Sequence, residues 1–344
     1  MSLRVGILGA TGAVGQRLIQ LLESHPTFDL VTLTASEESA DNPYREVAKW
    51  GIEGPIPSAV ATRRVVETTP DAVPTDVDLL FSSLPSGVAR ELEPAFCEAG
   101  YVVSSNSSND RMAPDVPLVI PEVNATHLDL LEVQRDERGW DGALVKNPNC
   151  STITFVPTLA AIADYGIERV HVATLQAVSG AGYDGVTSME IIDNAVPFIG
   201  GEERKLETES RRLLGTFNGS TVDHHDVRVA ASCNRIPTLD GHLENVWVET
   251  NDELTVDDAQ AALEAYPAID LDSAPEHPIV VFDEPDRPQP RLDRHLGDGM
   301  TITAGGLRES TFGLQYNCLS HNTIRGAAGA SVLNGELLVD RGYL

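Results

Sequence analysis

The sequence predicts an α/β protein in which a doubly wound parallel sheet is followed by a second domain of the α+β type. An apolar run at residues 3–8 leads directly into a glycine-rich turn and then a helical pattern. Up to about residue 149, short apolar strands alternate with helices, as in the βαβ units of a parallel sheet. After Cys150 the strands alternate in polarity and lie further apart. A chain of 344 residues is long enough for two domains.

The first strand, residues 3–8, is followed by the turn 9–15 and by a helix that ends before His25-Pro26. Strand, glycine turn and helix in this order are the context of a dinucleotide-binding fingerprint. Its glycines let the backbone approach a pyrophosphate at the helix N-terminus. We therefore expect a Rossmann-like domain whose cofactor-binding residues here are Gly9, Thr11, Gly12, Ala13, Val14 and Gly15.

The second strand, residues 30–34, ends in a tip that usually selects between NAD and NADP. Glu37 and Glu38 suit the ribose 2′-hydroxyl of NAD, whereas Ser36 and Ser39 are available to bond a 2′-phosphate. These residues leave the choice of cofactor open.

A further strand from residue 78 ends in a polar turn with Ser83 and Gly87, and a helix at 88–99 and a strand at 101–103 follow. Because ligands bind beyond the carboxyl ends of such strands, we expect Ser83 and Gly87 near the far end of the cofactor. The polar run 104–111 ends in Arg111, and its hydroxyls and guanidinium suit an anion.

Cys150 lies between an apolar strand at 143–145 and a helix in which apolar residues recur at 153, 156, 159 and 162. A helix N-terminus carries partial positive charge and lowers the pKa of a nearby thiol, which favours a nucleophilic thiolate. A small buried hydrophobe is the alternative, since free cysteine is among the most buried residue types. Position alone leaves both interpretations open.

The charge of the chain is strongly acidic, with 52 Asp and Glu against 24 Lys and Arg. A net charge of −28 makes nucleic acid an unfavourable partner, and because the acids are spread along the chain we interpret them as adaptation to high salt, as in halophilic organisms. The N-terminus lacks the features of a signal peptide, and no apolar run reaches the length of a membrane span. Four scattered cysteines indicate reduced thiols, so we expect a cytoplasmic protein that does not bind membranes.

The second half contains the groups that thiol chemistry at a carbonyl requires. A loop with Gln176, Ser179, Gly180 and Gly182 follows a strand, and Glu202 and Lys205 begin a later polar segment. Arg235 precedes His242 by seven residues, and a histidine with a pKa near 6.5 can act as general base and acid. The acid and histidine cluster 223–226 is interpreted as a strand-entry turn, so no metal site is expected.

With these residues assembled, the chain resembles aspartate-β-semialdehyde dehydrogenases of the archaeal and fungal form, nearly end to end. The resemblance depends on residues 9–15, 147–152, 176–182, 202–205 and 322–327, and on Arg235 with His242. It implies the reaction L-aspartate-4-semialdehyde + phosphate + NADP⁺ ⇌ L-4-aspartyl phosphate + NADPH + H⁺, in lysine, threonine, methionine and isoleucine biosynthesis. The likeness further implies residues 1–149 with the C-terminal helix 322–344 as the cofactor domain, and 150–321 as the catalytic and dimerisation domain of a homodimer or homotetramer.

The resemblance also implies individual roles. Cys150 attacks the carbonyl to form a thioester and His242 handles the protons. Arg235 grips the substrate carboxylate, Glu202 faces its ammonium, and Arg111 and Lys205 hold phosphate. Gln176 and Asn149 help bind and orient the substrate, and Asn322 holds the nicotinamide amide.

The chain departs from the family pattern at the tip of the second strand, and two alternative functions remain open. Archaeal relatives carry cations where this chain has Glu37 or Glu38 and Asn42, so NADP is the first choice and NAD is not excluded. The alternatives are a related acyl reductase, of the malonyl-CoA or N-acetyl-glutamyl-phosphate type, and a regulator that binds NAD(P) without catalysis.

Overall fold

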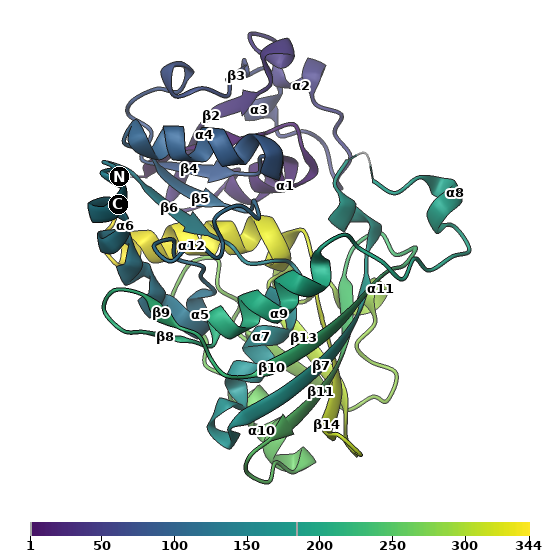
Figure 1. Cartoon of the computed structure of the whole chain (residues 1–344). Coiled ribbons are helices and arrows are strands. Elements are labelled where there is room, and N and C mark those ends of the chain that lie inside the picture. Colours follow the sequence, from purple (N-terminus) through teal and green to yellow (C-terminus); the bar gives the residue numbers. More distant parts are fainter. Residues whose placement is uncertain (1, 184) are drawn as a thin grey trace.

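The computed structural model describes residues 2–183 and 185–344, which form two six-stranded sheets (Figure 1). The N-terminal sheet has the order β3-β2-β1-β4-β5-β6 and is parallel throughout. Its strands are β1 (Leu3–Leu8), β2 (Phe28–Ala35), β3 (Val66–Glu67), β4 (Leu79–Ser82), β5 (Val102–Ser105) and β6 (Ala143–Lys146). The predicted doubly wound sheet is confirmed.

Helices cover this sheet because its strands are apolar on both faces. Strands β4, β5 and β6 are buried along their whole length, as expected for central parallel strands. The helices of this half are α1 (Ala13–Leu22), α2 (Tyr44–Val47), α3 (Ser58–Ala61), α4 (Ser86–Glu98), α5 (Pro121–Asn124) and α6 (Leu130–Arg138).

The C-terminal helix α12 (Gly329–Asp340) returns to the N-terminal sheet, where Figure 1 shows it running beneath β5 and β6. Val332 and Leu338 belong to the same core as Val5 and Ile7. The approach is close: a Cβ added at Gly335 would lie 2.8 Å from a methyl carbon of Leu79. A π-helical segment, Ile324–Ala328, leads into α12 and brings the chain past the end of the first sheet.

The second sheet is mixed, with the order β10-β7-β11-β14-β13-β12. Its strands are β7 (Ile167–Gln176), β10 (Arg228–Arg235), β11 (His242–Thr250), β12 (Ile279–Phe282), β13 (Ile302–Ser310) and β14 (Gly313–Ser320), and β8 (Thr216–Phe217) with β9 (Val222–Asp223) forms a separate small ribbon. The expected α+β character is confirmed.

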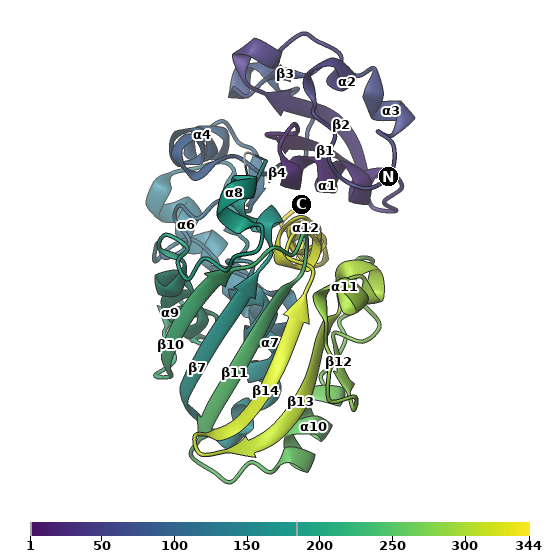
Figure 2. The ribbon, with the colours of Figure 1, turned by 90° about the vertical axis from the view of Figure 1, so that its right-hand side faces the viewer.

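One face of the second sheet is covered and the other is open. The covering helices are α7 (Thr152–Ala161), α9 (Glu202–Leu213) and α10 (Val256–Glu264), while the short helices α8 (Ser188–Ile191) and α11 (Pro290–Asp293) lie at its margins. Figure 2 shows the broad face of β7, β11 and β14 with no helix in front of it. Within residues 2–183 and 185–344, no helix combines the length and apolar character needed to cross a membrane.

Candidate active site

The glycine turn after β1 forms an open backbone cradle at the start of α1. Gly9 has a φ of +79°, which favours glycine, and a Cβ at Gly15 would lie 2.4 Å from the Gly9 carbonyl oxygen. A Cβ at Gly12 would meet nothing nearer than 3.6 Å, so this position faces open space. Gly15 therefore keeps helix and strand close, and Gly12 leaves room for a pyrophosphate on the helix N-terminus, which is the fit that a dinucleotide requires.

Two hollows extend from this cradle. The outer cavity, of about 510 Å³, is lined by residues 9, 11, 12, 35–37, 67–69, 83–85, 88 and 92. The thiol cavity, of about 640 Å³, is lined by residues 12–14, 83–86, 106–108, 111, 148–150, 179–183, 205, 322, 323, 326 and 327. They share Gly12, Ser83, Leu84 and Pro85, so together they form one track from the tip of β2 to Cys150.

The outer cavity bears on the choice of cofactor. Ser36 and Glu37 line it beside Glu67 and Thr69, and among its described lining residues there is no Arg or Lys. Ser39 and Gly87 lie outside the described linings of both cavities; Gly87 belongs to the first turn of α4. Hydroxyls and carboxylates, not cations, therefore face the adenosine end of the track.

Cys150 lies at the turn between β6 and α7, where Asn149 caps the helix. The Asn149 side-chain oxygen accepts hydrogen bonds from the backbone N–H groups of Ser151 (2.9 Å) and Thr152 (3.2 Å). Gly326 packs directly against Cys150, since a Cβ there would lie 2.8 Å from the cysteine Cβ. The thiol is thus held at the wall of its cavity by segments that are far apart in the sequence.

The expectation of a lowered Cys150 pKa is wrong. Burial, with a smaller contribution from the charge of Glu202, raises the pKa of the thiol to about 12, although Arg111, Lys205 and Arg235 act in the opposite direction. Desolvation therefore outweighs the nearby cations. Cys150 is therefore a protonated thiol at neutral pH in this structure.

His242 is the partner of that thiol. It begins β11, is fully buried, and its Nε2 lies 3.3 Å from the Cys150 Sγ. Its other nitrogen, Nδ1, accepts a hydrogen bond from the backbone N–H of Ala177 (3.1 Å). Burial and the charge of Arg235 lower the pKa of His242 to about 3, so the ring is neutral at physiological pH.

Helix α9 supplies two buried carboxylates that pair with the two cations lining the thiol cavity. Glu202 accepts hydrogen bonds from Asn149 Nδ2 (2.8 Å) and Lys205 Nζ (2.9 Å), and Lys205, despite the burial of Glu202, keeps the pKa of that carboxyl low. Glu209, seven residues later on the same face, accepts from Arg111 Nη1 (3.0 Å) and from the backbone N–H of Asn149 (2.6 Å). Arg111 and Lys205 both line the thiol cavity, as an anion site requires.

Sequence reasoning did not find Glu209, although a signal was present. Glu202, Leu206 and Glu209 are buried at helical spacing, so two carboxylates share the inward face of α9 with an apolar residue. A buried carboxylate on such a face needs a cation or several donors, which Arg111 and Asn149 provide here.

Arg235 and Gln176 lie just outside the thiol cavity. Arg235 Nη1 donates to the Ala177 carbonyl oxygen (2.7 Å), and a Cβ at Gly180 would lie 2.8 Å from the same Nη1. The guanidinium therefore lies directly behind the loop that lines the cavity. Gln176 is buried, its Nε2 donates to Thr174 Oγ1 (3.3 Å), and it is absent from the described linings of these cavities.

Asn322 joins two segments around the cavity. Its Nδ2 donates to Ser179 Oγ (2.8 Å), and its Oδ1 accepts from the backbone N–H of Gly241 (2.8 Å). It therefore ties the 179–182 loop and the residue before His242 to the C-terminal segment, and its side chain borders the thiol cavity.

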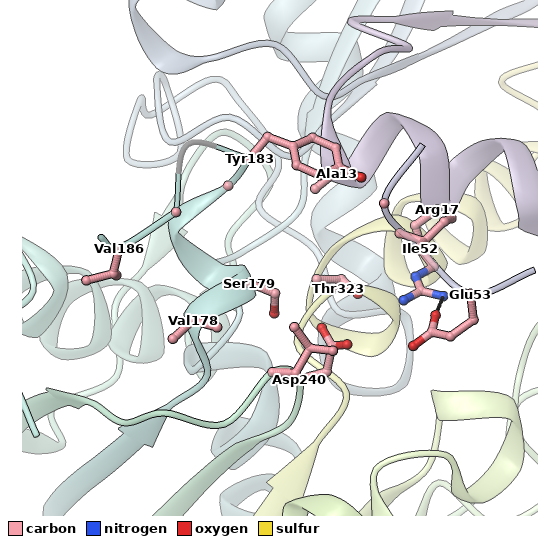
Figure 3. A pocket seen from close by; sticks show the side chains of 14 residues that line it. Ala13, Arg17, Ile52, Glu53, Val178, Ser179, Tyr183, Val186, Asp240 and Thr323 are labelled. Carbon is pink, nitrogen blue, oxygen red and sulfur yellow. Dashed lines mark hydrogen bonds and ion pairs between the residues drawn. The ribbon is translucent and has the colours of Figure 1, made fainter. Parts of the chain in front are cut away.

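A third hollow, of about 210 Å³, lies behind the same loop (Figure 3). Tyr183 spans from this loop to the first domain, where its hydroxyl donates to Gln16 Oε1 (2.7 Å). The backbone N–H of Gly51 donates to the same oxygen (3.0 Å), and Arg17 pairs with Glu53 (3.0 Å) at the opposite wall. Tyr183 and Gln16, which sequence reasoning also missed, connect the loop of the second half to α1.

Lys146 lies beneath the site and does not line the thiol cavity. It is fully buried, forms an ion pair with Glu93, and donates to Ser105 Oγ (2.9 Å) and Ser107 Oγ (2.7 Å). Ser105 and Lys146 lie at the carboxyl ends of β5 and β6, so the network joins this edge of the sheet, next to Cys150 and Arg111, to Glu93 on α4. Across the described parts of the chain, no cluster of three His, Cys, Asp or Glu side chains has the geometry of a metal site.

Comparison with known proteins agrees with this geometry. Residues 4–131 match the model of the semialdehyde dehydrogenase NAD-binding domain, and residues 159–325 match that of the semialdehyde dehydrogenase dimerisation domain. The aspartate-semialdehyde dehydrogenase of Methanothermobacter thermautotrophicus is 55% identical, over 97% of this chain and 98% of its own. This chain belongs to the aspartate-semialdehyde dehydrogenase family.

Two further relatives define the breadth of the likeness. The crystal structure of the Candida albicans aspartate-semialdehyde dehydrogenase with NADP superposes with a TM-score of 0.92 at 38% identity, and the match covers 100% of both chains. A malonyl CoA reductase (NADP) of Metallosphaera sedula is 35% identical over 100% of this chain and 98% of its own. A relative of similar length is thus named for a different acyl substrate.

Proposed function

We propose that the chain interconverts L-4-aspartyl phosphate and L-aspartate-4-semialdehyde plus phosphate, with NADP as the cofactor. The 3.3 Å contact between Cys150 Sγ and His242 Nε2, in a cavity continuous with the glycine cradle, carries this proposal. The Candida albicans relative, whose structure holds NADP, supports the cofactor assignment. The reaction belongs to lysine, threonine, methionine and isoleucine biosynthesis.

The chemistry proceeds through a covalent bond to Cys150. In the oxidative direction the thiolate adds to the aldehyde carbon, and loss of hydride converts the thiohemiacetal to a thioester. A nicotinamide bound along the track supplies the hydride acceptor. Phosphate then attacks the thioester, the carbon–sulfur bond breaks, and the thiolate returns to the protein.

The residues around the thiol divide the recognition of substrate and phosphate. Arg111 and Lys205 hold the phosphate, because both cations border the cavity. Glu202 faces the substrate ammonium, and Arg235 binds its carboxylate from behind the 179–182 loop. Gln176 and Asn149 orient the substrate, and Asn322 holds the nicotinamide amide next to Ser179.

An assay in molar KCl with aspartate semialdehyde and phosphate tests the proposal, with NADP⁺ and NAD⁺ in parallel. We expect phosphate-dependent reduction of NADP⁺, loss of turnover in Cys150→Ala, and unchanged binding of the cofactor by that variant. Cys97→Ala is the matched control, since Cys97 is buried on α4 away from the cavity. Turnover by Cys150→Ala would remove this cysteine from the mechanism, and preference for NAD⁺ would overturn the cofactor assignment.

A malonyl-CoA reductase is the second candidate, because a relative with that name covers the whole chain. The same assay run in reverse with malonyl-CoA and NADPH separates the two. Oxidation of NADPH with malonyl-CoA, and none with aspartyl phosphate, would favour this alternative. Binding of NADP(H) without turnover of either substrate would favour a regulator.

We further propose a cytoplasmic homodimer or homotetramer from a high-salt organism, divided into domains at residues 1–149 with 322–344 and 150–321. The match of residues 159–325 to a dimerisation-domain model and the uncovered face of the second sheet support assembly through that face (Figure 2). The net charge of −28 supports the salt adaptation. Sedimentation in 0.2 M and 2 M KCl tests the assembly and its dependence on salt. A monomer at both salt concentrations would contradict the assembly.

A further inference from the structure

The wall of the third hollow contains a buried carboxylate for which the protein provides no donor. Asp240 is only 4% exposed, and it lines this hollow (Figure 3). Its backbone carbonyl oxygen accepts a hydrogen bond from Arg294 Nη1 (3.2 Å). Within residues 2–183 and 185–344, however, its carboxylate oxygens form no hydrogen bond and no ion pair. Because a buried charge without a partner is costly, this carboxylate is suited to receive a donor from a ligand.

A cation on the same hollow has donors to spare. Arg17, in the second turn of α1, is 6% exposed, and its Nη1 donates to Gln20 Oε1 (2.9 Å) and Glu53 Oε2 (3.0 Å). In the described part of the chain its Nε is buried without a partner, and its Nη2 makes no hydrogen bond. Arg17 and Asp240 line one hollow without pairing with each other. The guanidinium therefore retains capacity for a carboxylate.

The other charged or titratable groups near Asp240 do not neutralise it. Arg294 directs its Nε to His295 Nε2 (3.2 Å) and its Nη1 to the Asp240 backbone, not to the carboxylate. His321, from the segment after β14, is fully buried, and burial lowers its pKa although the charge of Asp240 acts in the opposite direction. A neutral imidazole supplies no counter-charge, so Asp240 has none at neutral pH.

The remainder of the lining suits a small molecule. Ser179 Oγ accepts from Asn322 Nδ2 (2.8 Å), which leaves its own hydroxyl hydrogen for another acceptor, and Thr323 adds a second hydroxyl. Tyr183 and Glu53 are 44% and 56% exposed, so they mark the mouth of the hollow. Its volume of about 210 Å³ is a third of that of the thiol cavity, and apolar side chains complete its wall: Ile52, Val178, Val186 and Leu239.

We propose that the third hollow is a second ligand site, which binds a small free α-amino acid as its zwitterion. Arg17 binds the carboxylate of the ligand and Asp240 binds its ammonium. A ligand that carries both charges gives each of these groups its missing partner, whereas a simple anion or a simple amine leaves one of them unpaired. This site is additional to the proposed function and does not depend on it.

An occupant of this site would lie behind the wall of the active site. Ser179, Gly182, Tyr183 and Thr323 line both the third hollow and the thiol cavity. The Asn322 bond to Ser179 belongs to the same wall. The two sites are therefore separate in their charged groups and share a partition through which one ligand can influence the other.

Isothermal titration in 2 M KCl with saturating NADP⁺ tests the site, with glycine, L-alanine, L-serine and L-threonine as probes. We expect at least one of them to bind once per chain, and acetate and methylamine to bind at least about 10-fold more weakly, since each lacks one charge. Absence of amino-acid binding would overturn the proposal, as would equal binding of acetate. Binding that occurs only without NADP⁺ would assign the hollow to the cofactor track and overturn it too.

Variants locate the bound amino acid, because the proposed substrate is itself an amino acid. Arg17→Met and Asp240→Asn should each weaken the binding at least about 10-fold. Glu202→Gln, which changes the residue proposed to face the substrate ammonium, is the matched control and should leave the binding unchanged. The reverse pattern would place the amino acid in the thiol cavity and overturn the proposal. Because no turnover is measured, the outcome is decisive even if the proposed reaction is wrong.

The thermal midpoint of Asp240→Asn without any ligand gives an independent readout. Replacing an unpaired buried carboxylate by an amide of the same shape removes its desolvation cost, so we expect the free variant to melt higher than the wild type. A purely structural Asp240 would have a partner within the protein, and the variant would then melt lower. A lowered midpoint in scanning calorimetry would therefore overturn the proposal without reference to any probe.

Discussion

Glu209 and Arg111 form a buried ion pair, with 3.0 Å between Oε1 and Nη1, that connects α9 to the loop after β5. The second carboxylate oxygen of Glu209 accepts the N–H of Asn149, one residue before the nucleophile. One side chain thus fixes both the proposed phosphate-binding cation and the turn that carries Cys150.

Glu209→Ala should therefore impair stability and catalysis together. Removing one member of a buried ion pair typically costs about 3 kcal/mol, because the other charge is left unpaired. We expect a lower thermal midpoint, a raised KM for phosphate and a lower kcat, measured by calorimetry and steady-state kinetics. Glu207→Gln on the same helix is the control, since this half-buried carboxylate makes only a 3.4 Å bond. Loss of activity in the control as well would show that general damage to α9 is the cause.

Two alanine substitutions in the glycine turn should separate folding from cofactor binding. Gly15→Ala would press its Cβ against the Gly9 carbonyl, 2.4 Å away, and should lower both the thermal midpoint and NADP⁺ affinity. Gly12→Ala meets nothing nearer than 3.6 Å, so it should fold normally and lose only affinity. Calorimetry and isothermal titration measure the two effects, and undiminished NADP⁺ binding by Gly12→Ala would contradict the assignment of the cradle.

Glu37 should weaken binding of the 2′-phosphate. It lines the outer cavity, where it would oppose a phosphate by like charge. We expect Glu37→Ser to lower the KM for NADP⁺ several-fold in 0.2 M KCl, with less effect in 2 M KCl and none on NAD⁺. Glu38→Ser is the control, because Glu38 is exposed and lies outside the described lining of the cavity. An unchanged NADP⁺ KM in Glu37→Ser would show that the 2′-phosphate binds elsewhere.

Glu244 should destabilise the protein increasingly as pH rises. Burial raises its pKa well above 4.5, and this effect outweighs the opposing contribution of the Ser151 hydroxyl, while the charge of Glu202 adds to the rise. Between pH 4.5 and the raised pKa, the folded state holds a proton that the unfolded state has lost, so stability falls with increasing pH. Glu244→Gln removes this dependence.

Urea unfolding of the wild type and Glu244→Gln at pH 5 and pH 8 tests that assignment. The free-energy difference between them should shift in favour of the variant at pH 8. The opposite contribution of His242, whose lowered pKa favours folding as pH rises, is common to both proteins and cancels. An equal difference in unfolding free energy between the two proteins at pH 5 and pH 8 would show that Glu244 is ionised in the folded protein.

Much of the fold was predictable because its signals are local. The strand at 3–8, the glycine turn and the following helix need only neighbouring residues to be recognised, and the structure has β1 at Leu3–Leu8 and α1 at Ala13–Leu22. The strand expected at 143–145 is likewise observed at Ala143–Lys146. Hydrophobic periodicity specifies such elements within a few residues.

The pKa of Cys150 was not predictable in this way. Its position before α7 correctly indicated a helix terminus, but the pKa depends on how deeply other segments bury the thiol. Glu202 and Gly326 reach it from helix α9 and the C-terminal segment. Desolvation is a property of the assembled site and has no local sequence signal.

The sequence by itself determined the order of strands and helices, the cofactor cradle and the residue types of the site, because these depend on periodicity and on short motifs. Only the tertiary structure decided which nitrogen of His242 faces Cys150, and that Glu209 joins Arg111 to Asn149. It also placed Arg235 behind the loop instead of in the cavity wall. These relationships join residues up to about a hundred positions apart, and their energies come from burial and hydrogen-bond geometry that exist only once the two sheets have packed.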